Sequence, residues 1–207
     1  MKKLLLVLAL TCVILSGCGS NNTQTDTTKS ATNSSQNSST SEVSSENNSE
    51  IENSQPVVPT FGKTAQSFID VMRPYAQEQD ANLFTQEPKV SEMEAGEYLP
   101  EVTVYDYAVG NAGSLILYEV KSTGEFYQAL LAFDISKEDE TSILSLGRVS
   151  GLMMAMLEPD ENTRMIIDED LKTSNISEDA TTYATGTIAS WVYNVNSGQT
   201  YLTAIAS

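Results

Sequence analysis

The stretch that decides the fold runs from residue 101 to residue 135 and reads EVTVYDYAVGNAGSLILYEVKSTGEFYQALLAFDI. Its segments 101–109, 114–121 and 125–135 are rich in β-branched and aromatic side chains, which favour strands. The two short connections between them contain glycine, asparagine and serine, which are typical of turns. Because these connections are too short for crossovers, the three strands are predicted to form an antiparallel meander.

Helical periodicity flanks this meander on both sides. Apolar residues recur every three or four positions over 62–79 and again over 140–157, which predicts a helix in each range. Pro74 is expected to kink the first helix or to end it early. In the second helix, Gly147 and Gly151 are expected to allow close packing on the sheet.

A third helix and a hairpin complete the expected fold. Asp160 is predicted to cap a short helix that reaches about Leu171, with Met165, Ile166 and Leu171 turned inward. Residues 181–195 and 199–206 are strand-like, and a turn joins them as a hairpin. The resulting order α-β-β-β-α-α-β-β predicts an α+β fold, with an antiparallel sheet of about five strands and two to three helices packed on one face.

The N-terminus has the features of a secretory signal. Lys2 and Lys3 precede an apolar run over 4–15, which is shorter than the ~20 residues needed to span a bilayer. Leu15-Ser16-Gly17-Cys18 then resembles the lipobox of bacterial lipoproteins, in which a diacylglycerol is attached to the cysteine sulfur before a peptidase cuts ahead of it. The resemblance implies a signal peptide over 1–17 and lipidation at Cys18. An ordinary secretory signal or an uncleaved anchor are the alternatives.

A polar segment follows the lipobox. Residues 19–60 consist mainly of Ser, Thr, Asn and Gln with scattered acids, so they cannot bury enough apolar surface to offset their ordering entropy. We therefore expect a disordered tether over 18–60 and a single globular domain over 61–207. The lipobox resemblance further implies that this domain is held at the extracytoplasmic face of the cell membrane, with the lipid bilayer as a partner through Cys18.

Composition excludes several functions. The chain carries 28 acidic and 11 basic residues, a net charge of −17, and such a polyanion is repelled by nucleic acid. With no histidine, neither a Ser-His-Asp triad nor a His-ligated metal site can form. Of the two cysteines, Cys12 lies in the predicted signal peptide and Cys18 is the predicted lipidation site, so the domain has no thiol for disulfides or metal. No cofactor is predicted, with calcium as the one exception considered.

An acidic alternation near the third helix has the spacing of a calcium loop. Glu158, Asp160, Asn162 and Glu169 occupy places one, three, five and twelve of such a loop. However, Pro159 intervenes, and the sixth place holds Thr163 where the sharp turn needs glycine. We favour the simpler interpretation, in which these acids lie near a positively polarised helix start.

Three aromatic residues in the predicted C-terminal strands are candidates for partner binding. Trp191 and Tyr193 share one strand face, and Tyr183 has the same parity if 181–195 is a single strand. On an exposed face they would stack on a sugar or a partner protein. We favour a position beneath the helices, because one side of the sheet needs large core residues.

These features favour a non-enzymatic function. The leading hypothesis is a membrane-anchored module that binds a protein or glycan of the cell envelope, and no catalytic residue is assigned. The alternative is an envelope hydrolase that uses carboxylates and calcium. A small solute-binding lipoprotein ranks last, because about 145 residues is small for that class.

Overall fold

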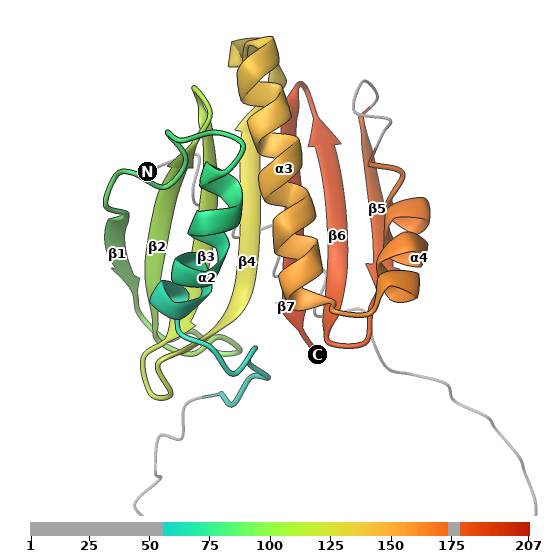
Figure 1. Cartoon of the computed structure of the whole chain (residues 1–207). Helices are drawn as coiled ribbons and strands as arrows, with labels where there is room; N and C mark the ends of the chain where they lie inside the picture. The colour runs from blue at the N-terminus through green and yellow to red at the C-terminus, as the bar shows by residue number, and fades with distance from the viewer. Residues whose placement is uncertain (1–55, 174–178) are drawn as a thin grey trace, which may run out of the picture. The chain divides into compact units, whose positions relative to one another are not determined.

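Figure 1 shows the fold in a computed structural model, which describes residues 56–173 and 179–207. The predicted signal peptide over 1–17, the predicted lipidation site Cys18 and the tether as far as residue 55 lie outside the described residues. The described residues all belong to one compact unit. No helix among them is long and apolar enough to cross a membrane.

Seven antiparallel strands form one sheet in the order β1-β2-β3-β4-β7-β6-β5. Their bounds are Lys89–Met93 (β1), Val102–Val109 (β2), Gly113–Val120 (β3), Glu125–Asp134 (β4), Ala180–Thr185 (β5), Ala189–Asn196 (β6) and Gln199–Ala206 (β7). The predicted α+β class with an antiparallel sheet is confirmed. The predicted number of about five strands and the predicted order are wrong, because each half of the chain contributes one more strand.

Both missed strands have a physical reason. β1 lies at the sheet edge and its side chains are almost all exposed, so it carries no alternation of apolar and polar residues. Residues 181–195 do not form one strand, because the chain reverses between β5 and β6. There the N–H of Gly186 donates to the carbonyl of Ala189 at 2.8 Å.

Three helices span Ala65–Gln77 (α2), Glu140–Leu157 (α3) and Glu161–Leu171 (α4). A side-chain cap precedes each one: Thr64, Asp139 and Asp160 each accept a hydrogen bond from the N–H three residues further on. The prediction of Asp160 as a cap is therefore confirmed. α2 contains Pro74 and continues beyond it to Gln77.

The helices all lie on one face of the sheet, as predicted (Figure 1). The core lies between them and the sheet and contains Trp191 of β6 and Phe126 of β4, both fully buried. The ring centroid of Phe126 lies 5.0 Å from that of Phe68 on α2. Burying side chains of this size contributes about 1.5–3 kcal/mol each.

The buried face of α4 differs from the predicted one. The prediction that Leu171 faces inward is confirmed, whereas the predictions for Met165 and Ile166 are wrong, because both are exposed and Ile167 is buried instead. The position of α4 beside β5 and β6, at the outer end of the helical layer, is the reason that these two side chains do not point inward (Figure 1).

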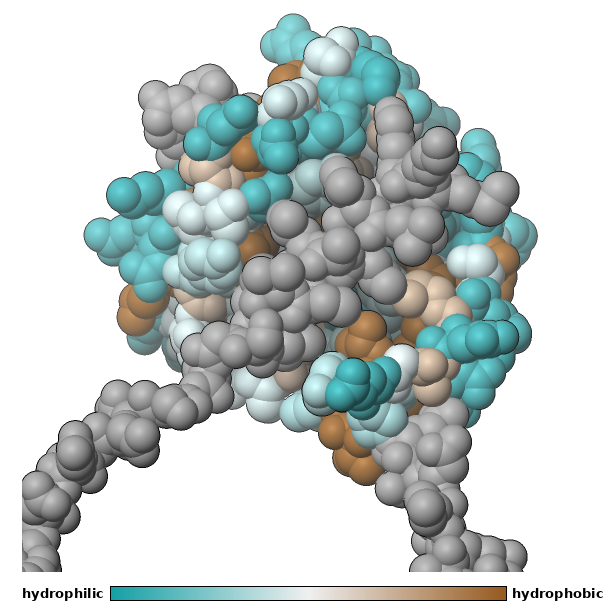
Figure 2. All heavy atoms as spheres, turned by 180° about the vertical axis from the view of Figure 1, so that it is seen from behind, coloured by the Kyte–Doolittle hydropathy of each residue, from teal (hydrophilic) through white to brown (hydrophobic). Residues whose placement is uncertain are grey.

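We call the side of the sheet away from the helices the second face. The strand register places Val104, Ile116, Tyr118, Leu130 and Val192 on it, and none of them belongs to the core cluster beneath the helices. An antiparallel sheet with one solvated face normally shows polar residues there. Figure 2 views this side, where hydrophobic residues are visible among hydrophilic ones.

Candidate functional site

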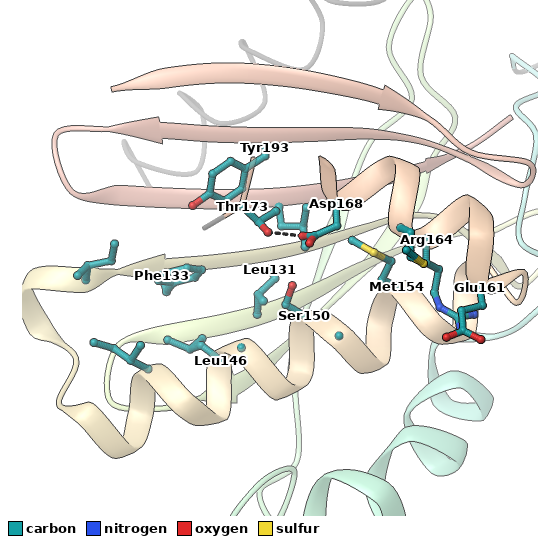
Figure 3. Close-up of a pocket in the computed structure, with 16 residues that line it drawn as sticks. Leu131, Phe133, Leu146, Ser150, Met154, Glu161, Arg164, Asp168, Thr173 and Tyr193 are labelled. Carbon is teal, nitrogen blue, oxygen red and sulfur yellow. Dashed lines mark hydrogen bonds between the residues drawn. The ribbon is translucent and has the colours of Figure 1, made fainter. Parts of the chain in front are cut away.

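A groove separates α3 from α4 on the helical side of the sheet (Figure 3). Its volume is about 560 Å³, which is within the usual range for sites that bind small molecules or a few side chains of a partner. Residues of α3 and α4 form its two walls, and residues of β4, β6 and β7 form its floor. The groove therefore depends on two helices and three strands that are spread over residues 131–202.

The floor and the α3 wall are mainly apolar. Leu131 and Phe133 of β4 and Leu202 of β7 lie on the floor, and Leu146 and Met154 project from α3. The rim is apolar in part as well, since Ile143 is 37 % exposed and Met165 of α4 is 66 % exposed. Exposed apolar side chains beside a groove are typical of a binding surface.

Small residues line the middle of the α3 wall. Gly147, Ser150 and Gly151 all face the groove. A Cβ atom built on either glycine would meet no atom within 4 Å. The expectation that these glycines allow close packing on the sheet is therefore wrong, because open space lies beside them.

The hydroxyl of Tyr193 is an unsatisfied polar group at the groove floor. Tyr193 is only 5 % exposed, and its hydroxyl oxygen is buried without a hydrogen-bond partner in the described structure. Burial raises the pKa of this hydroxyl to about 12, so it remains a protonated phenol near neutral pH. A buried hydroxyl without a partner is unfavourable, and a ligand that accepts or donates a hydrogen bond would remove that cost.

The α4 wall carries charge. Glu161 and Asp168 stand seven residues apart on this helix, two turns or about 10.5 Å along its axis. Arg164 lies between them, and its guanidinium donates to the carbonyls of Glu158 and Pro159 at 2.8 and 2.7 Å. Asp168 accepts a hydrogen bond from the hydroxyl of Thr173 (Figure 3).

The candidate calcium ligands do not converge. Glu158 is fully buried, and its carboxylate accepts the backbone N–H groups at residues 187–189 over 2.8–3.1 Å. Asp160 caps α4 by accepting from the N–H and hydroxyl of Thr163, and these hydrogen bonds lower the pKa of its carboxyl. Asn162 and Glu169 are exposed on α4. Residues 56–173 and 179–207 contain no group of three Asp, Glu, His or Cys side chains placed to hold a metal ion.

The aromatic candidates lie on different faces. Trp191 is fully buried and Tyr193 nearly so, both beneath the helices, which agrees with the favoured core position. Tyr183 pairs with Val192 and thus lies on the second face, where it is 56 % exposed. The assumed common parity is wrong because the reversal at 186–188 separates β5 from β6.

Sequence reasoning missed the groove itself. Its lining residues are spread between Leu131 and Leu202, so no local pattern describes it. The one usable signal was the spacing of Gly147 and Gly151 within a helix, where glycine is unfavourable. No protein-family model, no curated protein and no solved structure matches this chain. The function is therefore argued from the groove.

Proposed function

We propose that this protein is a lipid-anchored binding module of the cell envelope, which holds an apolar helical segment of a partner protein in the groove between α3 and α4. The observation that carries this proposal is the mainly apolar groove of about 560 Å³ with the unpartnered Tyr193 hydroxyl at its floor. The resemblance of residues 15–18 to a lipobox and the polar composition of the segment that follows support the proposed location at the extracytoplasmic face.

The glycines of α3 support a helical occupant. Each glycine inside a helix costs about 1 kcal/mol relative to alanine, and no described contact requires either one. Small residues on a helix surface allow a second helix to approach closely. An occupant between α3 and α4 would extend the existing layer of helices over β6 and β7.

The charge distribution supports a basic flank on that occupant. Glu161 and Asp168 both line the groove, and Arg164 is engaged with backbone carbonyls. The whole chain has a net charge of −17, which attracts cationic partners and repels anionic ones. A helix with one apolar face and lysine or arginine beside it matches both features.

Four of the described carboxyl groups are held in structural roles and are not suited to act as general acids. Hydrogen bonds lower the pKa values of Asp80, Asp134, Asp139 and Asp160, so each of these groups stays ionised near neutral pH. A general acid needs a raised carboxyl pKa instead. Each of the four also has a structural role, since it accepts hydrogen bonds from nearby donors.

A synthetic amphipathic helix of Leu and Lys, about 14 residues long, tests the proposal. We expect saturable binding by fluorescence anisotropy, and Gly147→Leu should weaken it about tenfold because the new side chain fills the groove. Ala155→Leu is the matched control: it adds the same side chain at an exposed position of α3 that does not line the groove, and it should bind like the wild type.

Two comparison peptides and a neutral dye identify the occupant. A Leu/Glu peptide of the same pattern should bind far more weakly, and a Leu/Lys peptide of shuffled order should lose most of its affinity. The neutral dye N-phenyl-1-naphthylamine should be displaced by the amphipathic Leu/Lys peptide. Equal binding of all three peptides, or equal binding by wild type and Gly147→Leu, would refute the groove as the site. Binding of the dye alone would indicate a small apolar ligand instead of a helix.

A further inference from the structure

The floor of the groove contains one polar group that its surroundings leave unsatisfied. Tyr193 of β6 pairs with Leu202 of β7, and Leu202 pairs with Leu131 of β4, so the Tyr193 side chain belongs to an otherwise apolar row. All three residues line the groove. The hydroxyl of Tyr193 is buried, and no described group bonds to it. Such a group is unfavourable unless a ligand supplies the missing hydrogen bond.

Two other hydroxyls on this side of the sheet do not fill that role. Thr200 lies two residues before Leu202 on the same face of β7, and its hydroxyl is also buried without a partner in the described part of the chain. Ser150 points from α3 into the groove (Figure 3), but no described hydrogen bond joins it to Tyr193. The missing partner is therefore expected on the occupant of the groove.

The charge of the site restricts the groups that could bind this hydroxyl. In a helical occupant the inner N–H and C=O groups bond to one another, so the partner has to be a side chain. A carboxylate is disfavoured by the net charge of −17 and by Glu161 and Asp168 on the α4 wall. An ammonium group would lose its hydration at the apolar floor. A neutral polar side chain fits this environment best.

Among neutral side chains, a carboxamide matches the phenol most closely. Burial raises the pKa of the Tyr193 hydroxyl to about 12, so near neutral pH it can donate one hydrogen bond and accept another. The side chains of asparagine and glutamine likewise donate and accept. Serine and threonine hydroxyls on a helix can instead bond to a carbonyl of their own helix, which makes them poorer partners.

We infer that the apolar face of the occupant carries one carboxamide side chain, an asparagine or a glutamine, which hydrogen-bonds to the Tyr193 hydroxyl. This inference rests on the proposed function and names the feature by which the groove distinguishes its partner from other apolar helices. A purely apolar helix would cover the hydroxyl and still leave it without a partner. One buried amide among apolar residues fixes the register of coiled coils in the same way. Tyr193 thus determines specificity and the position of the occupant along the groove.

Two series of variants of the amphipathic Leu/Lys peptide test this inference by fluorescence anisotropy. Each leucine is replaced in turn by glutamine and, in the second series, by methionine, which has a similar shape but no amide. We expect glutamine to weaken binding to the wild type at every position except one. At that position the glutamine peptide should bind at least as tightly as the methionine peptide. Tyr193→Phe should then weaken the glutamine peptide about tenfold and the methionine peptide clearly less.

Ser150→Ala is the matched control, because it removes a hydroxyl from the wall of the groove and not from its floor. Ser150 is only half-buried, so water can reach its hydroxyl, and the affinities of both series should change little. Circular dichroism verifies the fold of each variant.

Three results would overturn the inference. If glutamine weakens binding at every position, or if Tyr193→Phe affects both series alike, no amide binds the hydroxyl, whereas binding of the unmodified Leu/Lys peptide would still uphold the groove. A marked loss of stability in Tyr193→Phe would mean that the hydroxyl bonds within the fold. Loss of binding by every peptide, the unmodified one included, would instead refute the groove and this inference together.

Discussion

The carboxylate of Glu158 accepts a hydrogen bond from the backbone N–H of Ala189, 2.8 Å away and 31 residues later in the chain. Glu158 directly follows α3, and Ala189 begins β6. The same carboxylate also receives the N–H groups of Thr187 and Ile188. A side chain that resembles a calcium ligand in the sequence is thus an internal anchor for the turn between β5 and β6.

Replacing Glu158 by alanine should destabilise the fold strongly. Three backbone N–H groups would lose their partner at a site with no solvent exposure, and we expect a loss of about 3 kcal/mol or more in the free energy of unfolding. Urea denaturation measures this loss. Glu161→Ala, at an exposed position three residues later, is the matched control and should change stability by at most about 1 kcal/mol. A similar effect of both substitutions would contradict the anchoring role.

Gly186→Ala should also be destabilising, and its effect should depend on Glu158. A Cβ at position 186 would lie 2.0 Å from the Glu158 Oε1 atom, so the carboxylate would have to move. We expect a loss of about 2 kcal/mol in the wild type and a clearly smaller loss in the Glu158→Ala background. A double-mutant cycle by urea denaturation gives the coupling. Additive effects would mean that the steric conflict is relieved elsewhere.

Gly147→Ala should act in the opposite direction. Position 147 is helical and open, so the substitution should stabilise the fold by about 0.5–1 kcal/mol through helix propensity. The midpoint of urea denaturation reports this gain. Weaker binding of the Leu/Lys peptide to this more stable variant would link the glycine to the groove, whereas a loss of stability would show that the position is constrained within the fold.

Tyr193→Phe separates stability from binding. Because the hydroxyl has no partner in the described structure, its removal should leave the free energy of unfolding unchanged or raise it by up to about 1 kcal/mol. If the occupant hydrogen-bonds to this hydroxyl, peptide affinity should fall about 2–10-fold. Scanning calorimetry of the wild type and Tyr193→Phe measures their stability, and titration calorimetry measures their affinity for the peptide. A marked loss of stability would reveal a partner for the hydroxyl within the fold.

Asp134 should contribute to stability in a pH-dependent way. Hydrogen bonds from Lys137 and Ser136 lower the pKa of its carboxyl from 3.8 to about 2. Because the folded-state pKa lies below the ordinary value, this stabilisation is complete above pH 3.8 and disappears as the pH falls through about 2. Asp134→Asn should therefore be less stable than the wild type at pH 7, and the difference should shrink between pH 4 and pH 2. Urea titrations across this range test the prediction, and a constant difference would contradict it.

Local patterns predicted the local parts of this fold. The helix at 140–157, the strand at 199–206 and the cap at Asp160 agree with the structure because each depends on neighbouring residues. The break between β5 and β6 was missed because Glu158, about 30 residues away, holds the turn. β1 was missed because an exposed edge strand needs no apolar residues.

Only single residues of the candidate site could be predicted from the sequence. Tyr193 was singled out for its aromatic ring, but its unpartnered hydroxyl follows from packing and not from the sequence. Met165 was expected to face the core and instead lies on the rim of the groove. The position of α4 relative to α3 decides both the surroundings of Tyr193 and the exposure of Met165. No periodicity within either helix predicts that position.

The order of the strands has a consequence for the life of the chain before it is folded. β4 pairs with β7, so β7 lies between β4 and β6 in the sheet although it follows every other described strand in the sequence. Strands β1 to β4 can pair with one another before β7 is synthesised, and so can β5 with β6. These two groups of strands can join in one sheet only after residues 199–206 have been made.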